Sequence, residues 1–260
     1  MEDRALQYYD EGISFATLGR YSEAVASYDK ALAIDPDDAM TWYNRGVALV
    51  QLEKYADAVE SYDKAIAIDP KYSNAWCHRG IALADLGEYK KAVASYDLAL
   101  AIDPDDAEAW YNRGIVLADL GKYKKAIVSY DLALAIKPDY ANAWYNRGNA
   151  LADLGKYKKA VVSYDQALAI KPDYANAWYN RGIVLADLGK YKKAVASDDQ
   201  ALAIKPDHAE AWYNRGLALD KLKKYTDAVA SYDRALAIDP DYTGAQKNRE
   251  IALQGHNKRS

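Results

Sequence analysis

The side chains that most often do chemistry are few in this chain of 260 residues, and their spacing builds neither a catalytic nor a metal site. The three histidines, His78, His208 and His256, lie far apart, and the single cysteine, Cys77, is adjacent to His78. Neighbouring residues on a helix point away from one another, so this pair does not converge on a metal ion. There is also no glycine-rich phosphate loop and no nucleophile elbow. The sequence therefore predicts no enzyme activity, no metal and no cofactor.

The other side chains that could bind a ligand recur with a period of 34 residues. Every tryptophan follows the previous one at this spacing: Trp42, Trp76, Trp110, Trp144, Trp178 and Trp212. Counting from them gives seven units, at residues 5–38, 39–72, 73–106, 107–140, 141–174, 175–208 and 209–242. A partial eighth unit at 243–255 and a tail at 256–260 follow. This regularity predicts a single array over residues 5–255, in which each unit contacts its neighbours.

Each unit is predicted to fold as two amphipathic helices, called helix A and helix B. Apolar residues recur at helical spacing, for example Trp76 and Leu83 in the first half of the third unit and Tyr96 in the second. Glycine at position 15 suits the positive φ at the end of helix A, and these glycines are Gly87, Gly121, Gly155 and Gly189. All seven prolines stand at position 32 and end helix B. The predicted fold class is therefore all-α, with fifteen helices.

The aspartate that follows most of the prolines is predicted to cap the next helix A. Asp105 with Glu108, and Asp207 with Glu210, have the spacing of a capping box. Aspartate replaces the usual serine or threonine there, and its carboxylate can accept a hydrogen bond from an unpaired N–H group of the first helical turn.

The unit resembles the tetratricopeptide repeat. The residues that carry the resemblance are seen in the fourth unit: Trp110, Leu120, Gly121, Tyr123, Ala126, Tyr130, Ala133 and Pro138. The resemblance covers residues 5–255 and implies a right-handed α-solenoid superhelix of antiparallel helix pairs. It also implies a concave surface, formed by the A helices, that commonly binds peptides or protein segments. The pentatricopeptide class of RNA-binding proteins also stacks helix pairs, but its unit is one residue longer and this chain keeps 34 residues without drift.

Arginine and aspartate recur at two further positions, and we predict that they pair. Position 7 lies beside the tryptophan on the packed side of helix A and is arginine from the second unit on, while position 25 is always aspartate. Because the first unit has Glu11 at position 7, each aspartate is predicted to pair with the arginine of the following unit. The predicted pairs are Asp29–Arg45, Asp63–Arg79, Asp97–Arg113, Asp131–Arg147, Asp165–Arg181, Asp199–Arg215 and Asp233–Arg249. Their predicted role is to fix the register between units, and phosphate binding by the arginines is the functional alternative.

The opposite face of helix A is the predicted ligand-binding surface, because the resemblance places it in the concave groove. Tyrosine at position 5 offers contact area, asparagine at position 6 can hydrogen-bond a peptide backbone, and aspartate at position 13 makes the groove acidic. The candidate residues are Tyr43, Asn44, Tyr111, Asn112, Tyr145, Asn146, Asn149, Tyr179, Asn180, Tyr213, Asn214, Asp85, Asp119, Asp153 and Asp187. The structural alternative is that the tyrosines and asparagines partly hold neighbouring A helices together.

The partner is predicted to be a protein or peptide with basic or aromatic character. Some tetratricopeptide domains clamp acidic peptide termini with lysine at positions 5 and 2, asparagine at positions 9 and 6, and arginine at position 6 of three successive units. Here position 5 of the seven units is tyrosine or cysteine and position 2 is never basic, and only Asn180, with Asn149 before it, fits part of that pattern. The lysines gather instead at the turn between helices A and B, which we interpret as a solvated edge.

Composition argues against several other classes of protein. A net charge of −4 argues against a dedicated nucleic-acid-binding protein, and no apolar run approaches the ~20 residues of a membrane span. The N-terminal residues are acidic and aromatic where an export signal would be basic and then apolar, and the single cysteine favours a reducing compartment. We therefore expect a cytoplasmic protein with neither a membrane nor a nucleic-acid partner.

The sequence as a whole predicts a non-catalytic protein–protein interaction scaffold. Two alternatives remain open. One is self-assembly, in which the stack ends or the lysine edge of one molecule meet the acidic surface of another, and the other is a regulatory portion of a larger protein. Asp198 stands where the preceding unit has Tyr164, and this substitution predicts locally weaker packing.

Overall fold

The computed structural model describes the backbone of residues 2–257 and the side chains of residues 3–255. These residues form fifteen α-helices and no strand, which confirms the predicted all-α class. The helices are α1 Glu2–Thr17, α2 Tyr21–Leu32, α3 Ala39–Gln51, α4 Tyr55–Ile68, α5 Ser73–Asp85, α6 Tyr89–Ile102, α7 Ala107–Asp119, α8 Tyr123–Ile136, α9 Ala141–Asp153, α10 Tyr157–Ile170, α11 Ala175–Asp187, α12 Tyr191–Ile204, α13 Ala209–Lys221, α14 Tyr225–Ile238 and α15 Thr243–Asn257. Of the predicted tail at 256–260, the first two residues belong to α15 and residues 258–260 lie outside the described residues.

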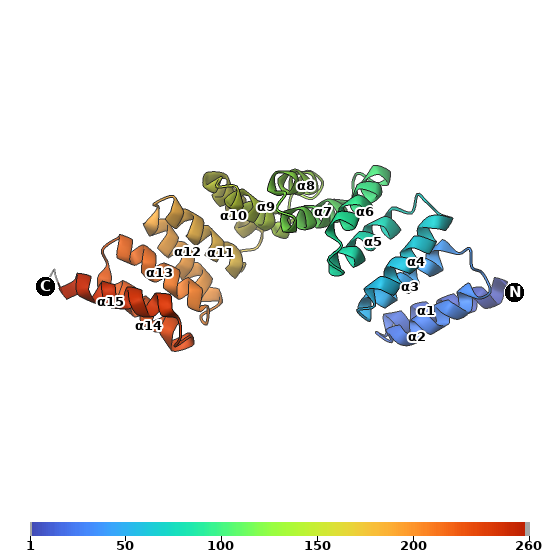
Figure 1. The fold of residues 1–260 in the computed structure, drawn as a ribbon, viewed down its shortest axis with the longest axis horizontal. Helices are drawn as coiled ribbons and strands as arrows, with labels where there is room; N and C mark the ends of the chain where they lie inside the picture. The colour runs from blue at the N-terminus through green and yellow to red at the C-terminus, as the bar shows by residue number, and fades with distance from the viewer. Residues whose placement is uncertain (1, 258–260) are drawn as a thin grey trace. The chain divides into compact units, whose positions relative to one another are not determined.

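The odd-numbered helices are the predicted A helices and the even-numbered helices are the predicted B helices, and Figure 1 shows them in chain order. Contacts group the chain into two compact units, one that ends at Ile136 and one that begins at Lys137. The first unit contains α1 to α8, and the second contains α9 to α15. The single array over residues 5–255 stays a prediction.

Within each of the two compact units, the A helices lie closer together than the B helices. Every helix packs against the next helix of the same compact unit, and each A helix also contacts the following A helix of that unit. In the described part of each unit, no B helix contacts the following B helix. Because the A helices of neighbouring pairs contact one another and the B helices do not, the A helices line the inner side of each stack. We call this surface the inner face.

The core of a helix pair is a tyrosine of helix B packed on a glycine of helix A. In the third repeat Tyr96 is buried, and a Cβ atom added at Gly80 would lie only 2.7 Å from its ring. Ala99 is also buried beside it, so small residues let the helices approach while the ring fills the space between them. The same glycine–tyrosine contact occurs in every repeat except the sixth, where Asp198 faces Gly182.

The turn between helices A and B has a positive φ at position 15, as predicted. The φ angles are 75° at Gly87, 68° at Gly121, 67° at Gly155 and 70° at Gly189. Two repeats carry other residues at this position, and Glu53 and Lys223 take similar angles of 57° and 60°. A side chain with a Cβ atom is strained in this conformation, so these two turns are less favourable than the glycine turns.

A tryptophan closes the turn between successive repeats. The indole N–H of Trp110 donates a hydrogen bond of 2.9 Å to the carbonyl oxygen of Pro104, and the other five tryptophans make the equivalent bond. In α15 Gln246 takes this place, and its Nε2 donates to the carbonyl oxygen of Pro240 at 2.8 Å. This bond explains why proline and tryptophan recur six residues apart.

The predicted helix caps are wrong by one residue. The cap of α7 is Asp106 and not Asp105, and its carboxylate accepts hydrogen bonds of 2.9 Å from the backbone N–H groups of the second and third helical residues. The residue before α13 is His208, which makes no side-chain cap bond, so the predicted cap Asp207 also lies one residue too early. The residue after proline belongs to the turn and is not adjacent to the first residue of the helix, where a cap must stand.

Candidate functional site on the inner face

Tyrosine and asparagine side chains on the inner face join successive A helices. The side-chain amide of Asn180 on α11 donates a hydrogen bond of 3.0 Å to the hydroxyl of Tyr145 on α9. Bonds of the same length join Asn44 to Tyr9 and Asn248 to Tyr213. Every predicted tyrosine and asparagine of this surface is half-buried. These bonded pairs therefore link neighbouring A helices, which is the structural role considered as the alternative above, while their exposed part remains accessible to a ligand.

A second aromatic residue packs on most of these tyrosines, and this contact was not predicted. It comes from position 34, the last residue before the next helix A. The ring centroids lie 5.0 Å apart for Tyr43 and Tyr72, 4.8 Å for Tyr145 and Tyr174, 4.6 Å for Tyr179 and His208, and 4.8 Å for Tyr213 and Tyr242. The period could have revealed the contact, because an aromatic residue recurs at position 34. The first and third repeats have aspartate there instead, at Asp38 and Asp106.

The third repeat departs from the pattern at Cys77 and His78. The ring of His78 packs edge-on against Tyr43 with centroids 5.2 Å apart, and its nitrogens lie 3.4 Å from the tyrosine hydroxyl. Cys77 is buried, and this burial raises the pKa of its thiol to about 12, with Asp106 and Glu108 adding to the rise. The thiol is therefore protonated at neutral pH and unsuited to act as a nucleophile. Within the described residues, no group of three histidine, cysteine or acidic side chains is arranged to hold a metal ion.

The inner face of the second unit contains a hollow of about 230 Å³, which we call the inner-face pocket. It is bounded by α9, α10 and α11. Its lining residues are Asn149, Ala152, Asp153, Tyr164, Asn180, Ile183 and Val184. Three of the predicted site residues, Asn149, Asp153 and Asn180, are therefore brought together here.

Asn149 organises the polar side of the inner-face pocket. Its Oδ1 accepts hydrogen bonds from the hydroxyl of Tyr164 at 2.8 Å and from the amide of Asn180 at 3.0 Å. Its Nδ2 makes no hydrogen bond to another described residue, so two donors remain for a ligand. The other repeats have apolar residues at this position, namely Ile13, Val47, Ile81, Ile115, Ile183 and Leu217. Asn149 thus adds a polar group that is peculiar to the fifth repeat.

The predicted aspartates are exposed on the inner face, two in each compact unit. Each is the last residue of its A helix: Asp85 on α5, Asp119 on α7, Asp153 on α9 and Asp187 on α11. None makes an ion pair with another described residue. Negative charge at the C-terminus of a helix opposes the helix dipole, so helix stability does not explain these residues. Their carboxylates are available to a cation.

The predicted ion pairs lie between each helix B and the following helix A. Arg79 Nε donates to Asp63 Oδ1 at 2.6 Å, which joins α5 to α4. Five further predicted pairs are formed: Asp29–Arg45, Asp97–Arg113, Asp165–Arg181, Asp199–Arg215 and Asp233–Arg249. The seventh, Asp131 with Arg147, has one residue in each compact unit and stays a prediction.

Each of these arginines except Arg249 also binds a serine that was not predicted to take part. Arg79 Nη1 donates to the hydroxyl of buried Ser95 at 2.7 Å. The same bond joins Arg45 to Ser61, Arg113 to Ser129, Arg147 to Ser163, Arg181 to Ser197 and Arg215 to Ser231. The guanidinium groups are thus engaged by the protein itself, which argues against the phosphate-binding alternative. Serine recurs at position 23 of all seven units, and this was the available signal.

Family models of the tetratricopeptide repeat match along the chain. A model described as TPR repeat matches residues 82–121, 116–155, 148–189 and 184–223, which is more than half of the chain. Models described as tetratricopeptide repeat match residues 9–73, 61–94 and 209–242. The chain therefore belongs to the tetratricopeptide repeat family, as the sequence predicted. Proteins of this family are generally non-catalytic scaffolds that bind protein or peptide partners.

Solved structures show the same fold. YrrB, described as a TPR protein with an unusual peptide-binding site, is 26% identical, with a TM-score of 0.67 over 74% of this chain and 99% of YrrB. A MamA protein is 28% identical, with a TM-score of 0.63 over 68% of this chain and 96% of MamA. The C-terminal part of a TPR protein from Cytophaga hutchinsonii is 20% identical, with a TM-score of 0.76 over 92% and 98%. Among curated proteins no match is found. None of the described helices is both long and apolar enough to cross a bilayer.

Proposed function

We propose that the protein is a non-catalytic scaffold that binds an extended segment of a partner protein on the inner face of its A helices. The proposal is carried by one observation: the side-chain amide of Asn149 has two unused hydrogen-bond donors beside the inner-face pocket. The other repeats have an apolar residue at this position. Asn149 Nδ2 is not among the buried polar atoms that lack a partner in the described residues, so it is open to solvent and can donate to a peptide carbonyl.

The lining of the inner-face pocket indicates the chemistry of the segment. Ile183 and Val184 form an apolar wall for a small apolar side chain, and Asp153 at the rim favours a basic residue next to it. The volume of about 230 Å³ lies below the ~300–1,000 Å³ of sites that enclose small-molecule ligands. A peptide side chain therefore fits better than a cofactor. The other candidate tyrosines, asparagines and aspartates of the second compact unit, such as Tyr145 and Asp187, extend the proposed surface within that unit.

Support for a peptide ligand also comes from the fold. YrrB, which shares it at 26% identity, is described as having a peptide-binding site. In this chain the proposed contacts come from the inner-face pocket, through Asn149, Asp153 and Ile183.

A peptide array tests the proposal. The purified chain is compared on basic–apolar, aromatic and acidic peptides with two variants, Asn149→Ile, which installs the residue of the fourth and sixth repeats, and Gln166→Ala on the exposed side of α10. We expect selective binding to basic–apolar peptides, weakened about tenfold or more by Asn149→Ile because a hydrogen bond and its donors are lost, and unchanged by Gln166→Ala. Equal binding by all three proteins, or a preference for acidic peptides, would overturn the proposal.

A further inference from the structure

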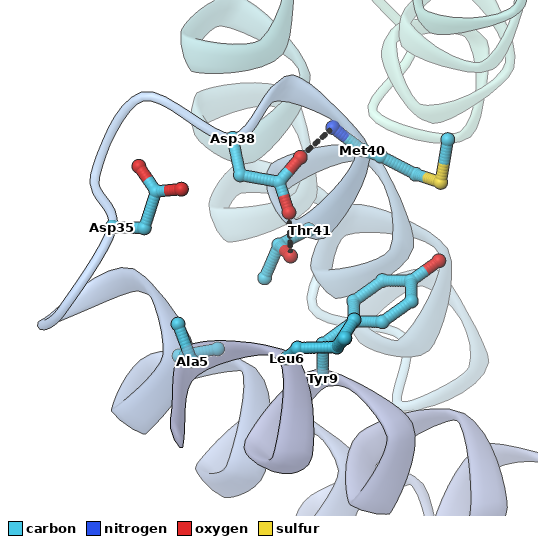
Figure 2. A pocket seen from close by; sticks show the side chains of 8 residues that line it. Ala5, Leu6, Tyr9, Asp35, Asp38, Met40 and Thr41 are labelled. Carbon is cyan, nitrogen blue, oxygen red and sulfur yellow. Dashed lines mark hydrogen bonds between the residues drawn. The ribbon is translucent and has the colours of Figure 1, made fainter. Parts of the chain in front are cut away.

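A separate hollow of about 250 Å³ lies in the first compact unit, at the N-terminal end of its inner face (Figure 2). Its lining residues are Ala5, Leu6, Tyr9, Ala31, Asp35, Asp38, Met40 and Thr41. Figure 2 shows Leu6 and Tyr9 of α1 on one side, with Asp38 and Met40 across from them. We call this hollow the N-terminal pocket.

The pocket exists because one repeating contact is missing. Tyr43, at the position of Tyr9 one repeat later, is covered by the ring of Tyr72 at 5.0 Å. The residue that would cover Tyr9 in the same way is Asp38. Its short side chain turns to the start of α3, where it accepts hydrogen bonds from the backbone N–H of Met40 at 3.0 Å and from the hydroxyl of Thr41. One face of the Tyr9 ring is therefore left without the aromatic partner that this position has elsewhere.

The walls of the N-terminal pocket combine apolar and acidic character. Leu6 and Met40 are 60% and 53% exposed, so both side chains are free to pack against a ligand. Asp35 and Asp38 supply two carboxylates, and no lysine or arginine lines the pocket. Asp38 is committed to its cap, whereas Asp35 is exposed and accepts only a hydrogen bond of 3.2 Å from the backbone of Asp37.

We propose that the N-terminal pocket binds an arginine side chain of a partner protein. The guanidinium group is planar, so it can stack on Tyr9 where a ring stacks in other repeats, and its charge complements Asp35. Its methylene groups pack between Leu6 and Met40. An aromatic side chain would fill the same space but leave the carboxylates without a counter-charge, and the compact ammonium of lysine lacks the planar face.

The test uses a capped tripeptide, acetyl-Gly-Arg-Gly-amide, titrated into the full chain while backbone amide resonances are followed by NMR. The control peptide carries citrulline, which has the same shape without the charge. We expect saturable shifts at Leu6, Tyr9 and Met40, and binding about tenfold weaker for citrulline, as the loss of a cation–π contact and an exposed ion pair implies.

Two variants of the pocket and one control complete the test. Asp38→Tyr installs the residue found at Tyr72 and should abolish the shifts by filling the pocket. Asp35→Asn, at an exposed residue that caps no helix, should weaken binding severalfold and keeps the test valid if the first variant does not fold. Asn149→Ile, in the other compact unit, should leave the titration unchanged and so separates this site from the inner-face pocket. Equal binding of the two peptides, or Asp35→Asn binding as tightly as the unaltered chain, would overturn the proposal.

Discussion

The carboxyl group of Asp198 faces the α carbon of Gly182, where in the other six repeats a tyrosine ring covers the corresponding glycine. The side chain is buried, and its Oδ1 has no hydrogen-bond partner among the described residues. Burial raises the pKa of Asp198 to about 8, with Asp199 adding to the rise and Arg215 opposing it. At neutral pH the folded protein therefore keeps this carboxyl group largely protonated, and ionising it costs stability.

Stability should fall as the pH rises from about 4 to about 8 because of Asp198. Its pKa is 3.8 as a reference and about 8 when folded, so in this window the folded state holds a proton that the unfolded state releases. The stabilisation present below pH ~4 is lost as the pH rises through ~8, at no more than about 1.4 kcal/mol per pH unit. Denaturant unfolding at several pH values measures this slope. Asp198→Asn should flatten it, and an unchanged slope in that variant would contradict the assignment.

Restoring the repeat pattern at this position should stabilise the protein. Asp198→Tyr removes a buried carboxyl group and fills the space beside Gly182, so we expect a gain of about 1–3 kcal/mol in the free energy of unfolding. The reverse change in the third repeat, Tyr96→Asp, should destabilise by more than about 3 kcal/mol because it empties a packed site. Thermal unfolding of both variants checks the pair of expectations. A lower midpoint for Asp198→Tyr would show that the sixth repeat has adapted to its aspartate.

Arg79 should matter more for stability than its partner Asp63. The arginine side chain is 21% exposed and binds both Asp63 and buried Ser95, whereas the aspartate is 51% exposed. We expect Arg79→Ala to cost about 1–3 kcal/mol and Asp63→Ala about 0.5–1 kcal/mol, since solvent screens the half-exposed pair. The double variant should cost little more than Arg79→Ala alone, which a double-mutant cycle of denaturant unfolding measures. Fully additive losses would mean that the two residues do not act as a pair.

Replacing Glu53 or Lys223 by glycine should stabilise the protein, because they belong to the two repeats without glycine at position 15. Glu53 and Lys223 hold φ angles of 57° and 60°, which suit glycine. We expect Glu53→Gly to stabilise by about 0.5–1 kcal/mol and Gly121→Ala, at a φ of 68°, to destabilise by about 1 kcal/mol. Thermal midpoints of the two variants test the sign of each change. Destabilisation by Glu53→Gly would indicate that its side chain contributes more than the backbone strain costs.

The fold was predictable because the residues that determine it lie within one 34-residue repeat. Helical spacing, the glycine of the A–B turn and the proline after helix B are local signals. They recur from repeat to repeat along the chain, so they do not arise by chance. The Asp63–Arg79 pair was predictable for a related reason, since the mismatch at Glu11 fixed the direction of pairing between units. The prediction of the helix caps failed because a shift of one residue in a tight turn decides which carboxylate reaches the free N–H groups of the first helical turn.

The site was less predictable because it depends on contacts among three helices. Asn149 and Asn180 were candidates, but their shared bonds with Tyr164 and the pocket beside them needed the packing of α9, α10 and α11. The serine that binds each arginine except Arg249, such as Ser95, is small and polar, and its residue type alone gives no signal. The N-terminal pocket arises from an absent aromatic residue at Asp38, which becomes meaningful only when the stacking partner of Tyr9 in other repeats is known.

The central claim is that a partner segment binds the inner face, and photo-crosslinking tests it most directly. A benzophenone amino acid replaces Asp153 at the rim of the inner-face pocket, where it disturbs no hydrogen bond of a described residue, and in a second protein it replaces Gln166 on α10. Each protein is irradiated with the tightest-binding array peptide, and the products are mapped by mass spectrometry. A crosslink from residue 153 and none from residue 166 is the predicted result. A crosslink mainly from residue 166, or none from residue 153 while the peptide is bound, would contradict the claim.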